Sequence, residues 1–522
     1  MTFASRNTLT LALGHGARAA SRLRGSGGSA FPGLVMEKAD PHFMARALAP
    51  LPYGVVLVSG TNGKTTTTRM VVELLRGQGL KVFTNPTGSN FTRGVVAALL
   101  GAMPLNGRLD ADVAVLELDE AHATHFVRTV KPRAALLLNV MRDQLDRFGE
   151  IDYTASLLHK VARATTGTVV LNADDPRLAA PSFRADLRAD VRGFAVSPQL
   201  RSVFLSDDEL HDSLDGCTLG QPKKDTETTP ATESEPAAKA DTKAEPATEA
   251  EPATEAEPAT KPEPAEQPAK PEQPAQLEPA EQPAKPEQPA QLEPAAQPEP
   301  AEQPAQPLEI VATLEEMVGR HAVIDLSGRR HEVDFAIPGA HNILNATAAM
   351  GLVKELLGER TDEQALVASA AKVTAAFGRG ELLSIDGQEV ELGLVKNPAG
   401  FRMSLLSAAA VRSQQPPLIM IAINDQYADG RDMSWLWDVD FTPLKQAGVS
   451  VVTGVRATDM ALRLSYDDVA VGKIEANLSQ ALAQLVKLSR EQHRPIRILS
   501  TYTAMLELRS LLASYTDVEE VL

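Results

Sequence analysis

The 522-residue chain has almost no cysteine, since only Cys217 occurs. A single thiol can form no disulfide within the chain and cannot build a structural zinc site, so we expect a protein of a reducing compartment that binds no zinc. Long apolar runs are also missing. No run reaches the roughly 18 residues that a bilayer-spanning helix needs, and we therefore predict no transmembrane segment.

An excess of basic residues is absent as well. The formal charge is −17, which argues against a nucleic-acid surface because phosphate binding needs a basic footprint. The negative charge is unevenly distributed, however. Residues 221–308 hold 19 acidic residues and only 7 lysines, so the rest of the chain is only mildly acidic.

Acidic residues are missing from positions 1–33, a stretch that contains Arg and Ser. A transit peptide has such a composition, but we favour a first helix followed by a Gly-rich turn. The stretch also lacks the continuous apolar core and the cleavage site of a secretory signal. We therefore expect residues 1–44 to be a helical and Gly-rich segment at the start of a cytoplasmic protein.

Residues 221–308 form a low-complexity insertion. They contain 20 of the 36 prolines, and the sequence EPAEQPAKPEQPAQL at 263–277 is repeated unchanged at 278–292. Regularly spaced proline and a near-absence of aromatic residues cannot bury a core. We predict a disordered tether rich in polyproline II, and favour a plain spacer over a binding role.

The remaining chain has the pattern of two α/β domains. Short β-branched runs alternate with helical stretches over residues 45–220, which is typical of a parallel sheet covered by helices. We expect this central domain to continue at residues 309–380, with the insertion looped out of it. A C-terminal α/β domain is expected at residues 381–522.

A glycine loop follows the first predicted strand, in the sequence VVLVSGTNGKTTTTRMVVELL. The glycines permit a tight turn, and backbone N–H groups at the helix start face the phosphates of a nucleotide. Lys64 is expected at the β- and γ-phosphates, and the Thr65 hydroxyl is expected to bind Mg²⁺. The predicted ATP-binding residues of the loop are Gly60, Thr61, Asn62, Gly63, Lys64, Thr65 and Thr66.

A second strand, in ADVAVLELDEAH, ends in Glu117, Asp119 and Glu120. The carboxyl ends of strands in an open α/β sheet are where ligands bind. We expect Glu117 to hold Mg²⁺ together with Thr65. The alternative is that Glu117 is a solvated charge in a loop.

Seven segments in order resemble the motif series of the Mur ligase family. They are GTNGKTT at 60–66, NPTGSN at 85–90, ELDEAH at 117–122, NVMRDQLDRFGE at 139–150, NADDP at 172–176, GAHNILNATAA at 339–349 and FGRGE at 377–381. These enzymes phosphorylate a carboxylate with ATP and let an amine attack the acyl phosphate. The resemblance implies a Mur ligase-like P-loop domain, with Asn139 and Asn345 beside the nucleotide and Arg379 at its phosphates.

The sequence departs from that family at two places. Gln144 stands where many members have a histidine, and LVKNPAGF at 394–401 has Lys396 where they have a histidine that handles the incoming amino acid. Gln144 argues against metal ligation at its position, and Lys396 indicates a different nucleophile. KNPAGF followed by INDQYADGRDMSWLWDVDF resembles the MurT subfamily in particular. By that resemblance, the chain phosphorylates the α-carboxyl of D-glutamate in lipid II at the inner face of the membrane. A GatD-type glutamine amidotransferase subunit supplies the ammonia that yields D-isoglutamine.

The acidic loop IAINDQYADGRDMSWLWDVDF contains no histidine or cysteine. A cysteine–histidine glutaminase needs a third group that orients its histidine. The resemblance implies that this chain supplies that group across an interface, with Asp429 as first candidate and Asp432 as second. Asp425 is instead expected to face the ligase site. The alternative is a cluster of capping and turn aspartates; if the stretch is extended, Trp435 and Trp437 face opposite ways, toward core and partner.

Two other functions remain open. The first is a stand-alone Mur-type ligase that adds an amino acid to a peptidoglycan precursor. The second is a non-catalytic scaffold for the glutaminase. The altered segment around Lys396 argues against the first function. The intact loop from Gly60 to Thr66, together with Glu117, argues against the second.

Overall fold

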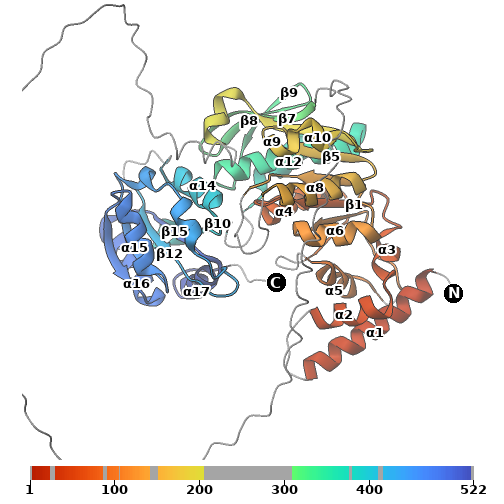
Figure 1. Cartoon of the computed structure of the whole chain (residues 1–522), viewed down its shortest axis with the longest axis horizontal. Coiled ribbons are helices and arrows are strands. Elements are labelled where there is room, and N and C mark those ends of the chain that lie inside the picture. The colour runs from red at the N-terminus through yellow and green to blue at the C-terminus, as the bar shows by residue number, and fades with distance from the viewer. Residues whose placement is uncertain are drawn as a thin grey trace, which may run out of the picture. The chain divides into compact units, whose positions relative to one another are not determined.

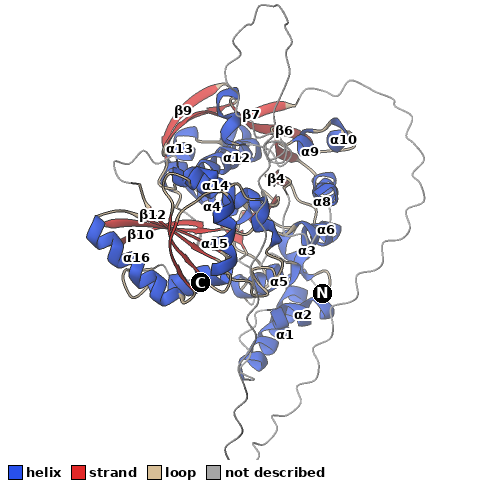
Figure 2. Cartoon of the chain, turned by 60° about the vertical axis from the view of Figure 1, so that its left-hand side comes forward, coloured by secondary structure: helices blue, strands red, loops and turns tan. Residues whose placement is uncertain are grey.

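The computed structural model describes residues 3–23, 30–85, 91–104, 106–141, 151–204, 308–374, 379–409 and 416–518. The predictions about Cys217, Gln144, the side chain of Arg379 and the insertion up to residue 307 lie outside the described residues. Within these ranges the chain forms two β-sheets, each flanked by helices (Figures 1 and 2).

The first sheet has the strand order β2-β3-β1-β4-β5-β6-β7-β8-β9, parallel as far as β7 and antiparallel beyond it. Its strands are β1 (Val55–Ser59), β2 (Val82–Thr84), β3 (Val113–Glu117), β4 (Ala134–Leu137), β5 (Thr168–Asn172), β6 (Asp190–Val196), β7 (Glu309–Val318), β8 (His321–Leu326) and β9 (Arg329–Asp334). Every residue of β1, β3 and β4 is buried, because helices cover both faces. Strands β6 and β7 pair directly, although the insertion separates them in the sequence.

Two layers of helices cover this sheet (Figure 1). On one face, α4 (Lys64–Gly77), α12 (Ala340–Leu357) and α13 (Glu363–Lys372) share a core that includes Leu74 and Met350. The other layer contains α1 (Phe3–Leu23), α2 (Ala30–Ala39), α3 (Phe43–Leu48), α5 (Thr92–Ala102), α6 (Glu120–Thr129) and α8 (Ile151–Ala164). Short helical turns follow at α9 (Pro176–Ala179), α10 (Pro181–Arg184), η1 (Pro198–Val203) and η2 (Gly358–Arg360).

The second sheet has the order β10-β11-β15-β12-β13-β14, and only the β10–β11 pair is antiparallel. Its strands are β10 (Arg379–Ile385), β11 (Gln388–Leu394), β12 (Leu418–Ala422), β13 (Val449–Thr453), β14 (Val471–Glu475) and β15 (Ile496–Ser500). Its helices are α14 (Pro398–Ala409), η3 (Ser434–Asp438), η4 (Thr442–Leu444), α15 (Ala457–Tyr466), α16 (Leu478–Gln492) and α17 (Tyr502–Leu512). Separate apolar cores on the two faces of this sheet hold the helices in place.

The two sheets confirm the predicted α/β class, with a largely parallel sheet that carries the phosphate loop and a second α/β sheet after it. None of the helices in the described ranges combines the length and the apolar content that crossing a membrane requires.

Candidate functional site

The phosphate loop joins β1 to α4 and depends on two glycines. Gly60 has φ of 137° and Gly63 has φ of 85°, in a region that L-residues with a side chain rarely adopt. A Cβ atom on Gly63 would lie 2.7 Å from Nδ2 of Asn345, and one on Gly60 would lie 3.0 Å from the backbone nitrogen of Asn139. The loop therefore requires glycine at both positions, because Asn139 and Asn345 lie against it.

Lys64 and Thr65 begin α4 and point polar groups toward the end of β3. The Lys64 ammonium donates to the Gly60 carbonyl over 2.6 Å and forms a buried ion pair of 3.1 Å with Glu120. The Thr65 hydroxyl donates to Oε1 of Glu117 over 2.7 Å. An ammonium group and the amino end of a helix together favour a phosphate chain.

The predicted Mg²⁺ ligands are thus in direct contact, and Asn85 holds one of them. The Asn85 side chain accepts from the Glu117 N–H and donates to the Glu117 carbonyl, both over 3.0 Å. In the part of the chain that is described, no three His, Cys, Asp or Glu side chains gather as a metal cage. One carboxylate and one hydroxyl fit Mg²⁺, which usually takes its other ligands from water and substrate phosphates.

Asn139 fixes the backbone of the phosphate loop. Its Oδ1 accepts from the N–H of Asn62 over 2.8 Å, and its Nδ2 donates to the Asn62 carbonyl over 3.2 Å. The Asn139 carbonyl also accepts from the N–H of Thr61 over 3.0 Å. Asn139 therefore orders the loop, in addition to lying beside the cavity described below.

The segment around Lys396 lies against the same loop. Asn397 is completely buried, and its Nδ2 donates to Oδ1 of Asn62 over 3.0 Å, while its own Oδ1 accepts from the N–H of Gly400 at the start of α14. The Lys396 ammonium lies 3.5 Å from the Thr61 carbonyl. The segment Lys396-Asn397-Pro398 therefore lies between the phosphate loop and the second sheet, next to any group that the loop binds.

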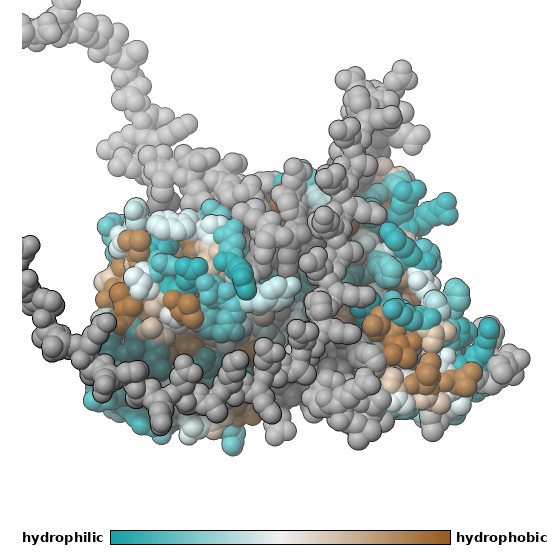
Figure 3. Space-filling model, turned by 60° about the horizontal axis from the view of Figure 1, so that its bottom comes forward, coloured by the Kyte–Doolittle hydropathy of each residue, from teal (hydrophilic) through white to brown (hydrophobic). Residues whose placement is uncertain are grey.

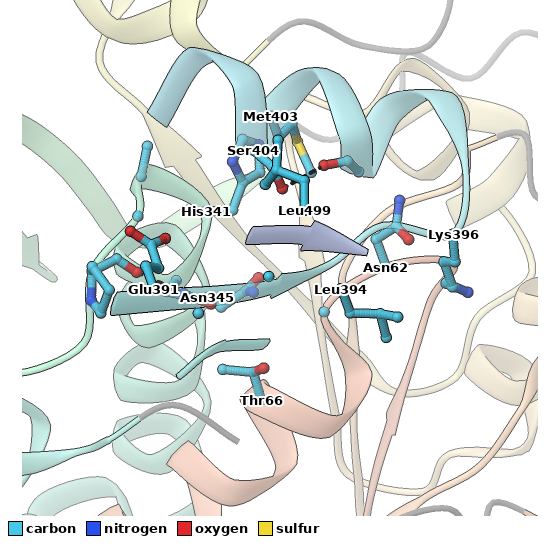
Figure 4. Close-up of a pocket in the computed structure, with 18 of the residues that line it drawn as sticks. Asn62, Thr66, His341, Asn345, Glu391, Leu394, Lys396, Met403, Ser404 and Leu499 are labelled. Atoms are coloured by element: carbon cyan, nitrogen blue, oxygen red, sulfur yellow. Dashed lines mark hydrogen bonds between the residues drawn. The ribbon is translucent and has the colours of Figure 1, made fainter. Parts of the chain in front are cut away.

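A cavity of about 170 Å³ lies between the phosphate loop, the start of α12 and the segment from β11 to α14 (Figure 4). Asn62, Thr66 and Asn345 line it from the first sheet's side, and Lys396 and Ser404 line it from the other. A smaller cavity of about 50 Å³ adjoins it through shared residues, and its walls combine apolar side chains such as Phe194, Phe204 and Leu344 with polar ones that include Asp174 and Asp175.

His341 lines both cavities and packs edge-on against Phe204, with 5.1 Å between the ring centroids. Loss of hydration lowers the pKa of His341 from 6.5 to about 4, so the ring is neutral at pH 7. Sequence reasoning quoted the motif that contains His341 and Asn342 but assigned a role only to Asn345. Glu120 and the motifs that contain Asn85 and Asn397 were also noted, but no role was predicted for these three residues, whose contacts join distant parts of the chain.

The aspartates of the acidic loop have different environments. Asp429 is buried, and its carboxylate accepts from the N–H of Gln426 and from both the N–H and the hydroxyl of Thr503. Asp432 is exposed and accepts from the N–H of Ser434, and hydrogen bonding to Ser434 lowers its pKa. Asp425 pairs with Arg456 over 2.9 Å, and none of the three aspartates lines the cavity beside the phosphate loop.

The two tryptophans also differ in exposure. Residues 434–438 form the 3₁₀ turn η3 and not an extended strand. The extended backbone on which the opposite orientation of Trp435 and Trp437 was predicted is therefore not present. Trp435 is nevertheless buried, with 4% of its surface exposed, while 50% of Trp437 is exposed. Trp437 contacts Tyr466 edge to face at 5.2 Å, and Tyr427 nearby in the sequence is 86% exposed.

Comparison with known families supports the resemblance in the sequence. Residues 58–217 match the Mur ligase middle domain, and residues 394–505 match the MurT ligase C-terminal domain. The chain is 28% identical to the MurT subunit of lipid II isoglutaminyl synthase (glutamine-hydrolyzing) from Streptococcus pneumoniae, over 93% of each protein. It is 25% identical to the subunit of the same name from Staphylococcus aureus, over 90% of each.

Solved structures share the fold. MurF from Acinetobacter baumannii matches with a TM-score of 0.57 at 14% identity, over 93% of this chain and 80% of that protein. Folylpolyglutamate synthase from Mycobacterium tuberculosis, complexed with ADP and AMPPCP, matches with a TM-score of 0.55 at 13% identity, over 92% of this chain and 95% of that protein. At these identities the likeness concerns the fold alone.

Proposed function

Because the chain belongs to the Mur ligase family and carries the MurT type of C-terminal domain, we propose that it is the ATP-dependent subunit of a glutamine-hydrolysing lipid II amidotransferase. In this function the chain phosphorylates the α-carboxyl of D-glutamate in the lipid II stem peptide. Ammonia then displaces the phosphate and forms the amide of D-isoglutamine. A GatD-type partner hydrolyses glutamine and supplies the ammonia.

The observation that carries this proposal is the phosphate loop, with Lys64 and the Thr65–Glu117 pair, placed beside the cavity that Lys396 also lines. Lys64 and the start of α4 would bind the phosphates of ATP, and Thr65 and Glu117 would hold Mg²⁺, which neutralises charge on the phosphates. Asn139 and Asn345 would lie beside the nucleotide. We propose that its base faces the adjoining smaller cavity, where Phe204 and Leu344 offer apolar contact beside polar side chains such as Asn172.

Lys396 supports ammonia over an amino acid as the nucleophile. An incoming amino acid brings its own carboxylate and side chain, which a ligase must recognise, whereas ammonia needs only access to the activated carbonyl. The Lys396 ammonium lies at the cavity wall next to the Thr61 carbonyl and gives this wall a positive charge. We propose that it steadies the negative charge of the acyl phosphate.

The acidic loop is proposed as the contact with the glutaminase. A partner's histidine must reach the carboxylate that orients it, and Asp432 is exposed whereas Asp429 is buried and holds the start of α17. We therefore propose Asp432 as the carboxylate that reaches the partner and Asp429 as the residue that positions the loop. Exposed Tyr427 and Trp437 offer aromatic anchors beside it.

The proposed substrate places the chain at the cytoplasmic face of the membrane. The test is amidation of purified lipid II by the chain and a GatD-type partner, read by mass spectrometry, with ATP or glutamine withheld in control reactions. Amidation that needs both subunits, ATP and glutamine supports the proposal. Addition of an amino acid by the chain alone would favour a stand-alone ligase, and amidation without any ATP consumption would favour a scaffold.

A further inference from the structure

A basic groove lies at the opposite edge of the first sheet from the phosphate loop. It has a volume of about 890 Å³ and contains five cationic side chains, those of Arg128, Lys131, Lys160, Arg163 and Arg188. Lys131 and Arg188 shortly precede β4 and β6, whereas the phosphate loop follows the end of β1. Since these strands are parallel, the groove and the candidate active site lie at opposite edges.

Most of this positive charge is uncompensated. Asp186 is the single carboxylate in the lining, and it already contacts His159 over 2.7 Å and Arg163 over 3.3 Å. Among the described residues, no carboxylate pairs with Arg128, Lys160 or Arg188, and all three are exposed. Such a concentration of cationic side chains with a single carboxylate among them favours an anionic ligand.

The groove belongs to a continuous layer of helices that ends in α1, a helix with exposed basic and apolar side chains. Contacts link α8 to α6, α6 to α5, α5 to α2 and α2 to α1, and Figures 1 and 2 show these helices in succession. Helix α1 has no acidic residue; Arg6 and Arg18 are exposed, and so are Leu9 (67%) and Leu13 (46%). Figure 3 shows apolar patches among the polar surface on both sides of the view.

We propose that this layer, through the groove of Arg128, Lys131, Lys160, Arg163 and Arg188, docks the chain on the phosphate groups of an anionic phospholipid membrane. The inference rests on the proposed function, because a lipid-linked substrate must be reached at a bilayer and no helix in the described ranges can span one. Clusters of four to eight Lys and Arg bind acidic lipids, and exposed leucines on a basic helix insert among headgroups. A nucleic acid offers no place for those leucines.

The test is sedimentation of the complete chain, with its glutaminase partner, on vesicles of phosphatidylglycerol or of phosphatidylcholine. The complex is expected to bind only the phosphatidylglycerol vesicles and to be released as NaCl is raised from about 50 mM to about 500 mM. The double variant Lys160→Glu/Arg188→Glu is expected to bind at least about tenfold more weakly. Arg320→Glu/Lys372→Glu changes the charge equally at exposed positions outside the groove and should bind as the wild type does.

Three results would overturn the proposal: no binding to phosphatidylglycerol, equal binding to both lipids, or equal weakening by the two double variants. Tighter binding of RNA than of vesicles at matched phosphate concentration would assign the groove to a different partner. Amidation of lipid II in detergent micelles separates this idea from the proposed function. Lys160→Glu/Arg188→Glu should retain amidation in micelles. If the wild-type complex showed no amidation in micelles, the proposed amidotransferase function would be refuted, whereas the vesicle experiment would still decide whether the groove binds anionic lipid.

Discussion

The side-chain amide of Asn397 donates to the side-chain oxygen of Asn62 over 3.0 Å, although 335 positions separate the two residues in the sequence. Asn62 belongs to the phosphate loop, and Asn397 lies buried in the connection between β11 and α14. The contact therefore ties the nucleotide-binding loop to the domain in which the nucleophile is proposed to arrive. Phosphoryl transfer from ATP to a carboxylate depends on such alignment, because small displacements of the reacting groups lower the rate.

Removal of this contact is expected to slow amidation without unfolding the chain. In Asn397→Asp the carboxylate still accepts from the Gly400 N–H and from Nδ2 of Asn62, but the shorter bond that Asn397 donates to Oδ1 of Asn62 is lost. We expect the amidation rate to fall about tenfold or more, with a melting temperature close to that of the wild type. The double variant Asn62→Ala/Asn397→Asp should amidate no more slowly than the slower of the two single variants. If the rate losses of the two single variants instead added up in the double variant, the contact would not couple the two domains.

Glu117→Gln is expected to weaken Mg²⁺ use. The amide keeps the shape of the side chain but loses the charge that the ion requires, so the maximal rate should fall about 10²-fold and the Mg²⁺ titration should shift to higher concentrations. Asp119→Asn, which removes a charge two residues away at a helix cap, is the matched control. Equal effects of the two changes would remove Glu117 from the metal site.

Asp432→Asn and Asp429→Asn should fail in different ways. Asp432→Asn is expected to reduce glutamine-dependent amidation and to spare amidation with added ammonia, because only the partner's histidine is affected. Asp429→Asn disturbs a buried carboxylate with three donors, so we expect a loss of stability of about 1–3 kcal/mol and a joint decline of both activities. If Asp429→Asn instead spared the ammonia reaction selectively, Asp429 would be the residue that reaches the partner.

His341 is expected to make stability depend on pH. Its pKa is about 4 in the folded chain and near 6.5 when unfolded, so between these values the unfolded chain binds more protons and acid favours unfolding. The effect is absent above pH of about 7 and grows to no more than about 3 kcal/mol at pH of about 4. Denaturant unfolding should show that the free energy of unfolding falls less for His341→Gln than for the wild type as the pH is lowered over this range. An equal fall in both proteins would contradict a neutral, desolvated ring.

Local sequence was sufficient to predict the phosphate loop. Gly60, Gly63, Lys64 and Thr65 act within one turn of chain, so the order of strand, glycines and helix determined their arrangement. Glu117 could be paired with Thr65 because parallel strands end at a common edge.

Long-range contacts could not be predicted in the same way. The pairing of Lys64 with Glu120, the support of Glu117 by Asn85 and the meeting of Asn62 with Asn397 depend on tertiary packing. The burial of Asp429 depends likewise on Thr503, which follows it by 74 positions. Residues of the basic groove come from α6, α8 and three connections, and no motif joins them in the sequence.

Transfer of oxygen from the substrate to phosphate tests the central claim most directly. Lipid II labelled with ¹⁸O in the D-glutamate α-carboxyl would be amidated by the chain and its glutaminase partner with ATP, and the released inorganic phosphate analysed by mass spectrometry. We expect the label in inorganic phosphate, because the carboxylate oxygen attacks the γ-phosphate and leaves with it when ammonia forms the amide. Label in AMP, or amide formation with no label in phosphate, would contradict an acyl phosphate made at the loop of Lys64 and Thr65.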